Sequence, residues 1–292
     1  MLTGVVLAGG ESRRFGSDKL LARVRGAPMV SHVVSALREL TDRVVVSVRD
    51  PRSRGSLENV LGPGLEWIGD RPGSGSDGPG AGMLAALELV DRGELLFVPG
   101  DMPWLEAPAL RELLRRARGS GAACAAPLAS DGWTVPLVQY QRRAPRKPRL
   151  ALLSRRVTGP SLRPTDLVRG GRSAVLIPTE LLSGEPRAFR NVNVPGELRW
   201  RGSVPTTGSP RRTVRRAPEA ARAFWAAVTA ESHQDGDSAA RLYESESRFY
   251  GRAGLGHLKL HALEDALRCS RAGRLPTQEL EHRLTRARAR LG

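Results

Sequence analysis

From Met1 to about Gly119, short and mainly apolar segments alternate with amphipathic ones, and this alternation strongly restricts the fold. Short segments with near-continuous apolar residues are typical of strands buried on both faces, and the amphipathic segments between them predict crossover helices. Together they predict a parallel sheet covered by helices on both sides. We expect strands at 3–8, 43–48, 65–68 and 94–99 and helices at 29–40, 81–91 and 107–118.

Beyond Gly119 the pattern continues and then changes character. Further strands are expected at 121–127, 135–140, 173–178 and 189–194, with a basic, proline-rich excursion between the second and third. Residues 203–216 are rich in Gly, Pro, Ser, Thr and Arg and have linker composition. Residues 217–292 are polar with helical apolar spacing, which predicts three or four helices. We therefore expect an α/β domain over residues 1–202, with a Rossmann-like, mostly parallel sheet, followed by a linker and a basic all-α module.

The chain carries a formal net charge of +16, and its basic residues gather in two stretches. Residues 139–172 hold ten Arg or Lys against one acid, and residues 201–292 hold 17 against ten. Such fields attract anionic substrates or nucleic acid, unless arginine is simply the default polar residue of this chain. Aromatic residues make up only 4% and are not interleaved with the charge, which argues against single-strand nucleic-acid binding.

Cysteine content and hydropathy bear on the compartment. Cys124 and Cys269 are too few and too far apart for a disulfide framework or a metal cluster, so both are expected to be packing residues. No segment approaches the roughly 20 apolar residues of a membrane span. The N-terminus enters the first strand without a basic stretch, an apolar core and a cleavage site. We expect a cytoplasmic protein with no membrane partner.

The segment from Gly9 to Lys19 follows the first expected strand and combines two adjacent glycines with basic side chains. Without side chains at Gly9 and Gly10, successive backbone N–H groups can face a polyphosphate. Arg13 and Lys19 add positive charge, and Lys19 is one of only three lysines among 46 basic residues. The spacing matches neither the Walker loop nor the dinucleotide-binding fingerprint, and an ordinary strand-to-helix turn is the simpler alternative. The combination predicts a phosphate-binding loop at the carboxyl edge of the sheet.

Asp101 comes directly after the apolar strand expected at 94–99, so its carboxylate is expected at the same edge as the glycine-rich loop. Mg²⁺ prefers oxygen ligands and is commonly held by one or two carboxylates together with phosphate oxygens and waters. A single aspartate at this place is therefore chemically sufficient for a Mg²⁺ site. A turn-forming aspartate before Pro103 is the alternative.

Four motifs, taken in order, resemble the nucleotidyltransferases related to molybdenum cofactor guanylyltransferase. They cover residues 1 to about 200 and are jointly more specific than any one alone. The motifs are Leu-Ala-Gly-Gly-x-Ser-Arg-Arg-Phe-Gly-x-Asp-Lys at 7–19, Gly-Pro-Gly-Ala-Gly-Met at 78–83, Gly-Asp-Met-Pro at 100–103 and Asn-Val-Asn-Val-Pro-Gly-Glu-Leu at 191–198.

The resemblance implies a sheet of the nucleotide-diphospho-sugar transferase type and a role for each matched residue. Catalytic roles are implied for Lys19, Arg13 and Asp101, with Asp101 also holding Mg²⁺. Asn191 and Asn193, expected on one face of a strand, are implied to meet the metal or the acceptor. The residues implied to bind the nucleotide are Leu7, Ala8, Gly9, Gly10, Lys19, Ser47, Asp70, Gly80 and Asp101.

This sequence departs from the family pattern at three places. Ser47 stands where members often carry Asn, Gly80 replaces the usual Leu, and Asp70 lies in a stretched Gly/Ser loop in which Asp77 is a competing choice. These departures leave base selectivity open. Relatives that transfer cytidylate tend to carry Leu-Ala-Ala-Gly in the first loop, so Leu-Ala-Gly-Gly favours guanine.

The resemblance implies a Mg²⁺-dependent transfer of GMP from GTP to the phosphate of molybdopterin, with or without molybdenum, and release of pyrophosphate. The basic stretch from Arg142 to Arg172 would hold the pterin phosphate or dock a molybdoenzyme or its chaperone. Rival enzymes of this fold use CTP, or transfer to cobinamide phosphate or a sugar phosphate. A non-catalytic regulator that binds nucleotides or other polyanions is the rival from another class. The helical module lies outside the resemblance.

Overall fold

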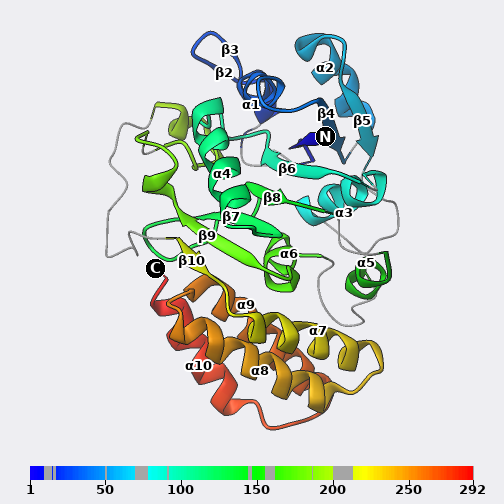
Figure 1. The fold of residues 1–292 in the computed structure, drawn as a ribbon, viewed down its shortest axis with the longest axis vertical. Helices are drawn as coiled ribbons and strands as arrows, with labels where there is room; N and C mark the ends of the chain where they lie inside the picture. Colours follow the sequence, from blue (N-terminus) through cyan, green and yellow to red (C-terminus); the bar gives the residue numbers. More distant parts are fainter. Residues whose placement is uncertain are drawn as a thin grey trace.

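The computed structural model describes residues 1–9, 15, 18–49, 51–69, 78–90, 92–143, 147–154, 162–185, 187–199 and 213–291, with only the backbone at 51–53, 147, 154 and 199. An eight-stranded sheet forms its centre (Figure 1), in the order β10-β9-β7-β8-β6-β1-β4-β5. Its strands are β1 (Leu2–Leu7), β4 (Arg43–Val48), β5 (Glu66–Gly69), β6 (Glu94–Pro99), β7 (Cys124–Leu128), β8 (Gln139–Gln141), β9 (Ala174–Pro178) and β10 (Val214–Arg215).

Helices surround this sheet, and a two-stranded ribbon of β2 (Arg23–Val24) and β3 (Ala27–Pro28) lies beside it. The helices of the α/β part are α1 (Met29–Arg38), α2 (Pro51–Leu61), α3 (Pro79–Leu89), α4 (Ala107–Gly119), α5 (Lys147–Ser154) and α6 (Pro164–Gly170). The helices that follow the sheet are α7 (Pro218–Ser232), α8 (Gly236–Arg252), α9 (Gly256–Ala272) and α10 (Gln278–Ala289).

Strand direction confirms the predicted mostly parallel sheet. β1 pairs in parallel with β4 and β6, β4 with β5, and β7 with β9, whereas β8 and β10 run antiparallel to their neighbours. In this register Leu7 lies opposite Ser47 of β4 and Pro99 of β6. The last residues of the three central strands therefore meet at one edge, and the loops that follow them are brought together there.

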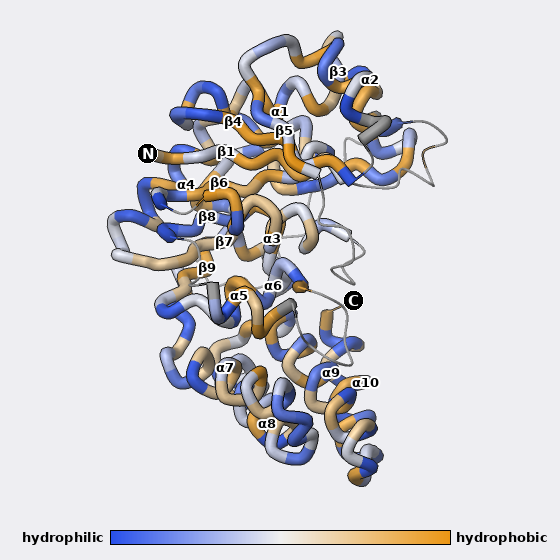
Figure 2. The backbone as a smooth tube through the Cα atoms, turned by 90° about the vertical axis from the view of Figure 1, so that its right-hand side faces the viewer, coloured by the Kyte–Doolittle hydropathy of each residue, from blue (hydrophilic) through white to orange (hydrophobic). Residues whose placement is uncertain are grey.

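The two faces of the sheet are covered by different helices, because successive strand residues point to opposite sides. Val6 packs in one core with α1, α2 and α4, and Val5 packs in a second core with α3, α5 and α6. Both strand residues are fully buried. Figure 2 shows the most apolar colours running along β1, β4 and β6 through the interior.

Helix α2 and the end of the linker both differ from the sequence prediction. Helix α2 was not predicted, because only Leu57 and Leu61 among its described side chains are buried and Gly55 interrupts the pattern. Residues 213–216, the end of the predicted linker, instead join the sheet: Val214 pairs with Leu176, and Arg216 N–H donates to the Ala174 carbonyl at 2.9 Å. Residues 203–212 of that linker lie outside the described residues.

The predicted helical module is present as four helices, α7 to α10, gathered at one end of the molecule (Figure 1). Its apolar core is continuous with the second core of the sheet. One cluster runs from Phe97 of β6 through Leu167 of α6 to Phe224 of α7 and Leu263 of α9. The module is therefore packed into the same hydrophobic core as the α/β part. None of the described helices is long and apolar enough to cross a membrane.

Two histidines of α9 lie in the junction between the module and the α/β part. His257 Nδ1 lies 2.7 Å from Thr134 Oγ1, and His261 Nδ1 lies 2.7 Å from Thr165 Oγ1. Burial lowers the pKa of His257 to about 4 and the pKa of His261 to about 2. Nearby Arg163 lowers both pKa values further, while Asp265 opposes the shift at His261.

These depressed pKa values predict a loss of stability in mild acid. An unfolded chain binds the histidine protons near pH 6.5, whereas the folded protein binds them only near pH 4 and pH 2. The histidine contribution is full above pH 6.5 and declines as the pH falls through that window. We expect the free energy of unfolding at about pH 5 to be lower than at about pH 7 by about 2 kcal/mol for each histidine. Urea unfolding at the two pH values measures this difference.

A matched pair of variants separates the buried histidines from the rest of the chain. His257→Asn keeps a polar group near Thr134 but removes one buried titration, so its stability should change less between the two pH values. His282→Asn, on the exposed face of α10, should leave the profile of the unaltered protein unchanged. Equal pH dependence of the unaltered protein and His257→Asn would contradict the assignment.

Candidate active site

The first loop leaves β1 between the ends of its two neighbouring strands. Ala8 N–H donates to the Ser47 carbonyl at 2.8 Å, and Gly100 N–H donates to the Leu7 carbonyl at 3.0 Å. The start of the loop is thus fixed by backbone hydrogen bonds to both sides. Leu7 and Ala8 are buried and Gly9 is partly exposed, so the chain approaches the surface at Gly9.

Lys19 stands at the start of a short 3₁₀ turn, Lys19–Leu21, whose N-cap is Asp18. The Asp18 carboxylate accepts from Leu20 N–H at 3.1 Å. Leu20 is buried, and an ideal Cβ on Gly100 would lie 3.2 Å from its side chain. The cap and the buried leucine therefore fix the backbone that carries Lys19 against the turn after β6.

The carboxylate of Asp101 forms an ion pair with the ammonium group of Lys19. Lys19 Nζ lies 2.6 Å from Asp101 Oδ2, and the two side chains are 13% and 14% exposed. The second carboxylate oxygen, Asp101 Oδ1, is buried and has no hydrogen-bond partner among the described residues. A buried carboxylate oxygen without a donor is unfavourable unless a cation or donor reaches it. Such an oxygen is suited to a hard cation such as Mg²⁺.

The last motif, at the end of the α/β part, also contacts this site. Val192 N–H donates to the Asp101 carbonyl at 2.9 Å, so the segment is tied directly to the metal-site candidate. Asn193 Oδ1 lies 3.5 Å from Lys19 Nζ and accepts from Asn191 Nδ2 at 3.2 Å. Lys19, Asp101 and Asn193 thus form one polar cluster, although they lie far apart in sequence.

The prediction of a strand at residues 189–194 is wrong. The backbone of these residues makes no ladder: its N–H groups bond instead to Asp101 and to Glu197, whose Oε2 accepts from Asn193 N–H at 2.6 Å and Val194 N–H at 3.2 Å. The two asparagines nevertheless meet, because this loop folds around Glu197. Neither Glu197 nor Asp18 was assigned a role from the sequence, although Glu197 belongs to the last motif and Asp18 has the residue type of an N-cap.

The other sequence-predicted residues divide into three groups. Ser47 is buried at the end of β4, beside the start of the first loop. Gly80 lies in the first turn of α3, and an ideal Cβ on it would lie 1.6 Å from the Leu162 carbonyl oxygen. The departure from the usual Leu therefore has a local steric reason. Gly10, Arg13, Asp70 and Asp77 lie outside the described residues.

Two of the described arginines in the basic stretch from Arg142 to Arg172 are paired with carboxylates of the chain itself. Arg169 is fully buried and bonds to Asp166, Glu246 and Asp265, and Arg163 bonds to Glu264 and Asp265. For these two arginines the expected role in phosphate or partner binding is wrong, because the carboxylates of the chain itself neutralise them. The exposed basic residues described in the stretch are Arg142, Arg143, Arg149 and Arg172.

Within the described part of the chain, no three His, Cys, Asp or Glu side chains gather as a metal site. Cys124 and Cys269 are both buried, as expected for packing residues, and burial raises the pKa of Cys124 to about 12. One protein carboxylate completed by substrate phosphates and water is a ligand set typical of Mg²⁺.

Comparison with known proteins points to one family. The MobA-like NTP transferase domain matches residues 4–163 of this chain. A probable molybdenum cofactor guanylyltransferase of Pyrococcus horikoshii is 33% identical over 195 residues, which cover 66% of this chain and 94% of the relative. The molybdenum cofactor guanylyltransferase of Serratia proteamaculans is 33% identical over 207 residues, which cover 68% of this chain and 93% of the relative.

A solved structure shares the fold. The crystal structure of molybdopterin-guanine dinucleotide biosynthesis protein A from Archaeoglobus fulgidus matches with a TM-score of 0.53 and 24% identity, over 68% of this chain and 95% of the other. Helices α7 to α10 lie beyond the residues matched to the transferase domain.

Proposed function

Since the chain belongs to the MobA-like NTP transferase family, we propose that this nucleotidyltransferase moves GMP from GTP to the terminal phosphate of molybdopterin. The observation that carries the proposal is the cluster of Lys19, Asp101 and Asn193 at the carboxyl edge of the sheet. It gathers a cation, a carboxylate with one unsatisfied oxygen and an amide at the edge where a nucleotide is expected.

Asp101 would hold the Mg²⁺ ion, with Oδ1 as the ligand atom. This oxygen is buried, it lacks a donor among the described residues, and its neighbour Oδ2 already accepts from Lys19. When bound, Mg²⁺ neutralises phosphate charge and orients the phosphate oxygens. Asn193 also places a side-chain oxygen beside this group, since its Oδ1 lies 3.5 Å from Lys19 Nζ.

Lys19 would neutralise charge on the donor phosphates. The acceptor phosphate is already anionic and needs no general base, so the protein's work is to hold donor and acceptor in line. An acceptor oxygen forms a bond to the α-phosphorus of GTP as the bond to the pyrophosphate oxygen breaks. The ion pair with Asp101 already holds the Lys19 ammonium at the position where these phosphates are proposed to bind. Arg13 is proposed to add a second positive charge.

The nucleotide would lie along Leu7, Ala8, Gly9 and Gly10, with Ser47, Asp70 and Gly80 lining the base side. The exposed Asn191 and half-buried Asn193 would contact the acceptor from across the site. Guanine rather than cytosine is proposed as the base because the first loop reads Leu-Ala-Gly-Gly. Molybdoenzymes or their chaperones are the proposed protein partners that receive the product.

The proposal is tested by nucleotide competition in the presence of each acceptor. With Mg²⁺ and molybdopterin, pyrophosphate release should require GTP, and excess CTP should leave it nearly unchanged. The same mixture with cobinamide phosphate or a sugar phosphate should show no release above background. Turnover with CTP, or with another acceptor only, would identify a different transferase of this fold. Salt-dependent polyanion binding without turnover would identify a non-catalytic regulator.

A further inference from the structure

The segment Leu162–Gly170 joins the nucleotide side of the sheet to the helical module. On one side, the Leu162 side chain is buried in the same cluster as Leu84 and Leu87 of α3. On the other side, Gly170 at the end of α6 lies against α7: Trp225 Nε1 donates to the Gly170 carbonyl at 2.8 Å. An ideal Cβ on Gly170 would lie 2.8 Å from the Trp225 ring, so this contact is made by backbone.

The contact with α3 is also a backbone contact, and it falls on the second of the four sequence motifs. The Leu162 carbonyl oxygen occupies the place where a Cβ of Gly80 would be, with only 1.6 Å to the ideal position. Gly80 lies in the first turn of α3, one residue after Pro79 and within the Gly78–Gly82 segment. Any shift of residues 162–163 therefore changes the packing on the first turn of this helix.

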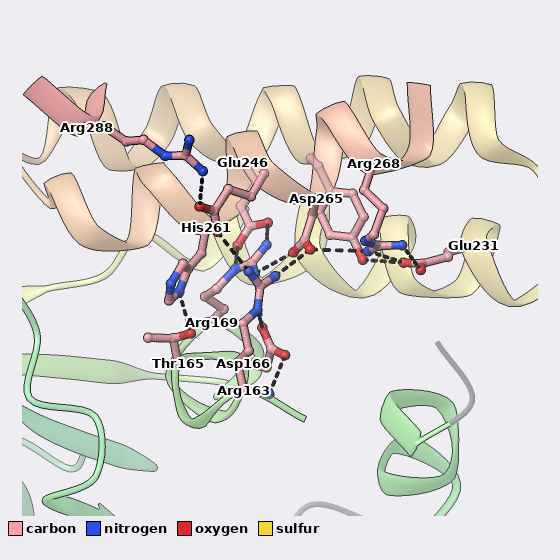
Figure 3. A network of polar contacts seen from close by, with 12 residues as sticks. Arg163, Thr165, Asp166, Arg169, Glu231, Glu246, His261, Asp265, Arg268 and Arg288 are labelled. Carbon is pink, nitrogen blue, oxygen red and sulfur yellow. Dashed lines mark hydrogen bonds and ion pairs between the residues drawn. The ribbon is translucent and has the colours of Figure 1, made fainter. Parts of the chain in front are cut away.

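Charged side chains hold the same segment to the module (Figure 3). Arg163, directly after Leu162, bonds through Nη2 to Asp265 Oδ1 and through Nη1 to Glu264 Oε2 at 3.3 Å. Arg169 donates to Glu246 at 2.9 and 2.7 Å and to Asp265 Oδ2 at 2.7 Å.

Through these contacts, Arg163 near the start of the segment and Arg169 near its end are attached to α8 and α9. Arg169, Glu246 and Asp265 are essentially withdrawn from solvent, so each charge needs its partner in place. Buried polar groups that are fully paired define one arrangement, because a shifted arrangement leaves charges unpaired. The module thus fixes this segment in one position, and with it the Leu162 carbonyl oxygen that contacts α3.

We propose that the helical module α7–α10 is a positioning element of the nucleotide site, which acts through Arg163 to hold the Leu162 carbonyl against the first turn of α3. The inference rests on the proposed function, since it takes the Gly78–Gly82 segment as part of the GTP site. Arg163 is a positioning residue: it reaches the nucleotide only through Leu162 and Gly80. The module thereby has a role within its own chain rather than as a separate docking domain.

The test uses the full chain with Arg163→Gln, which keeps a polar side chain but gives up the ion pairs to Glu264 and Asp265. Asp265 retains its bonds to Arg169 and Arg268, so the buried network stays paired. We expect the Kd for GTP with Mg²⁺ and the KM for GTP to rise about tenfold, a typical coupling between linked sites, while kcat changes less than twofold. The KM for molybdopterin should stay constant.

Three further variants define the result. Arg163→Lys should recover part of the GTP affinity, because one ammonium can still pair with a carboxylate of α9. Glu264→Gln, which weakens the anchor from the module side, should raise the Kd for GTP by a smaller factor. Arg283→Gln is the matched control, because Arg283 pairs with Glu244 inside the module at 2.5 Å and should leave GTP binding unchanged.

The outcomes separate this inference from the proposed function. Unchanged GTP affinity in both Arg163→Gln and Glu264→Gln, in a protein that otherwise binds GTP, would overturn the positioning role alone. An equal rise in Arg283→Gln would also overturn it, because the effect would then reflect the module's general stability. Failure of the unaltered protein to bind GTP would remove both proposals. Unfolding midpoints of all variants show whether each is compared as a folded protein.

Discussion

Replacing Asp101 with alanine is expected to lower Mg²⁺-dependent pyrophosphate release by about a thousandfold or more, because the proposed metal ligand is lost. The change removes the buried Oδ1, which has no donor among the described residues, together with the partner of Lys19. Without the Asp101 carboxylate, the proposed Mg²⁺ ion would no longer be held where it neutralises the phosphates of GTP. Steady-state pyrophosphate release over a range of Mg²⁺ concentrations measures the effect.

A more conservative change isolates the metal from the rest of the site. Asp101→Asn keeps an oxygen at the same place but removes the charge, so half-maximal activity should need more Mg²⁺. Asp131→Ala is the matched control, because Asp131 is an exposed loop aspartate whose carboxylate accepts only from Trp133 N–H in the described contacts, at 2.9 Å. Full activity of Asp101→Ala, with its normal Mg²⁺ requirement, would rule out Asp101 as the ligand.

The second large effect is expected from Lys19→Ala, which should lower kcat by about a hundredfold to a thousandfold. Lys19 is a positive charge fixed at the strand edge, and its loss leaves Asp101 without its ion-pair partner. The fall in kcat should exceed the rise in the KM for GTP, because charge on the phosphates grows in the transition state. Single-turnover kinetics with saturating GTP measures the chemical step directly.

Two controls accompany this prediction. Lys259→Ala removes another of the three lysines of the chain, on α9 of the module, and should leave turnover unchanged. Lys19→Arg keeps the charge but replaces a compact ammonium by a planar guanidinium, so it should restore activity only in part. Equal kcat for Lys19→Ala and the unaltered protein would show that this lysine takes no part in the transfer.

The sequence was sufficient to predict the central strands, because their signal is local. β4 and β6 begin and end where they were expected, since each is a mainly apolar segment that is buried after its first residue. Lys19 and Asp101 could be placed at one edge because parallel strands bring the loops after β1 and β6 together. The motif order then selected the family, which the comparisons confirm.

Long-range pairing could not be predicted from the sequence. Residues 189–194 alternate like a strand, but their hydrogen bonds go to Asp101 and Glu197. Val214 and Arg215 look like linker residues and become an edge strand only because β9 is there to pair with them. Arg163 and Arg169 read as part of an exposed basic stretch, and nothing local shows that Glu246 and Asp265 of the distant helices neutralise them.

The proposed transfer of GMP is tested most directly by the position of a label in the product. The full chain is incubated with Mg²⁺, molybdopterin and GTP labelled at either the α- or the γ-phosphate, and the products are separated. We expect a molybdopterin–guanine dinucleotide that carries the α label but not the γ label, with the γ label in pyrophosphate. A dinucleotide formed only from CTP, or no labelled pterin product from a chain that binds both substrates, would contradict it.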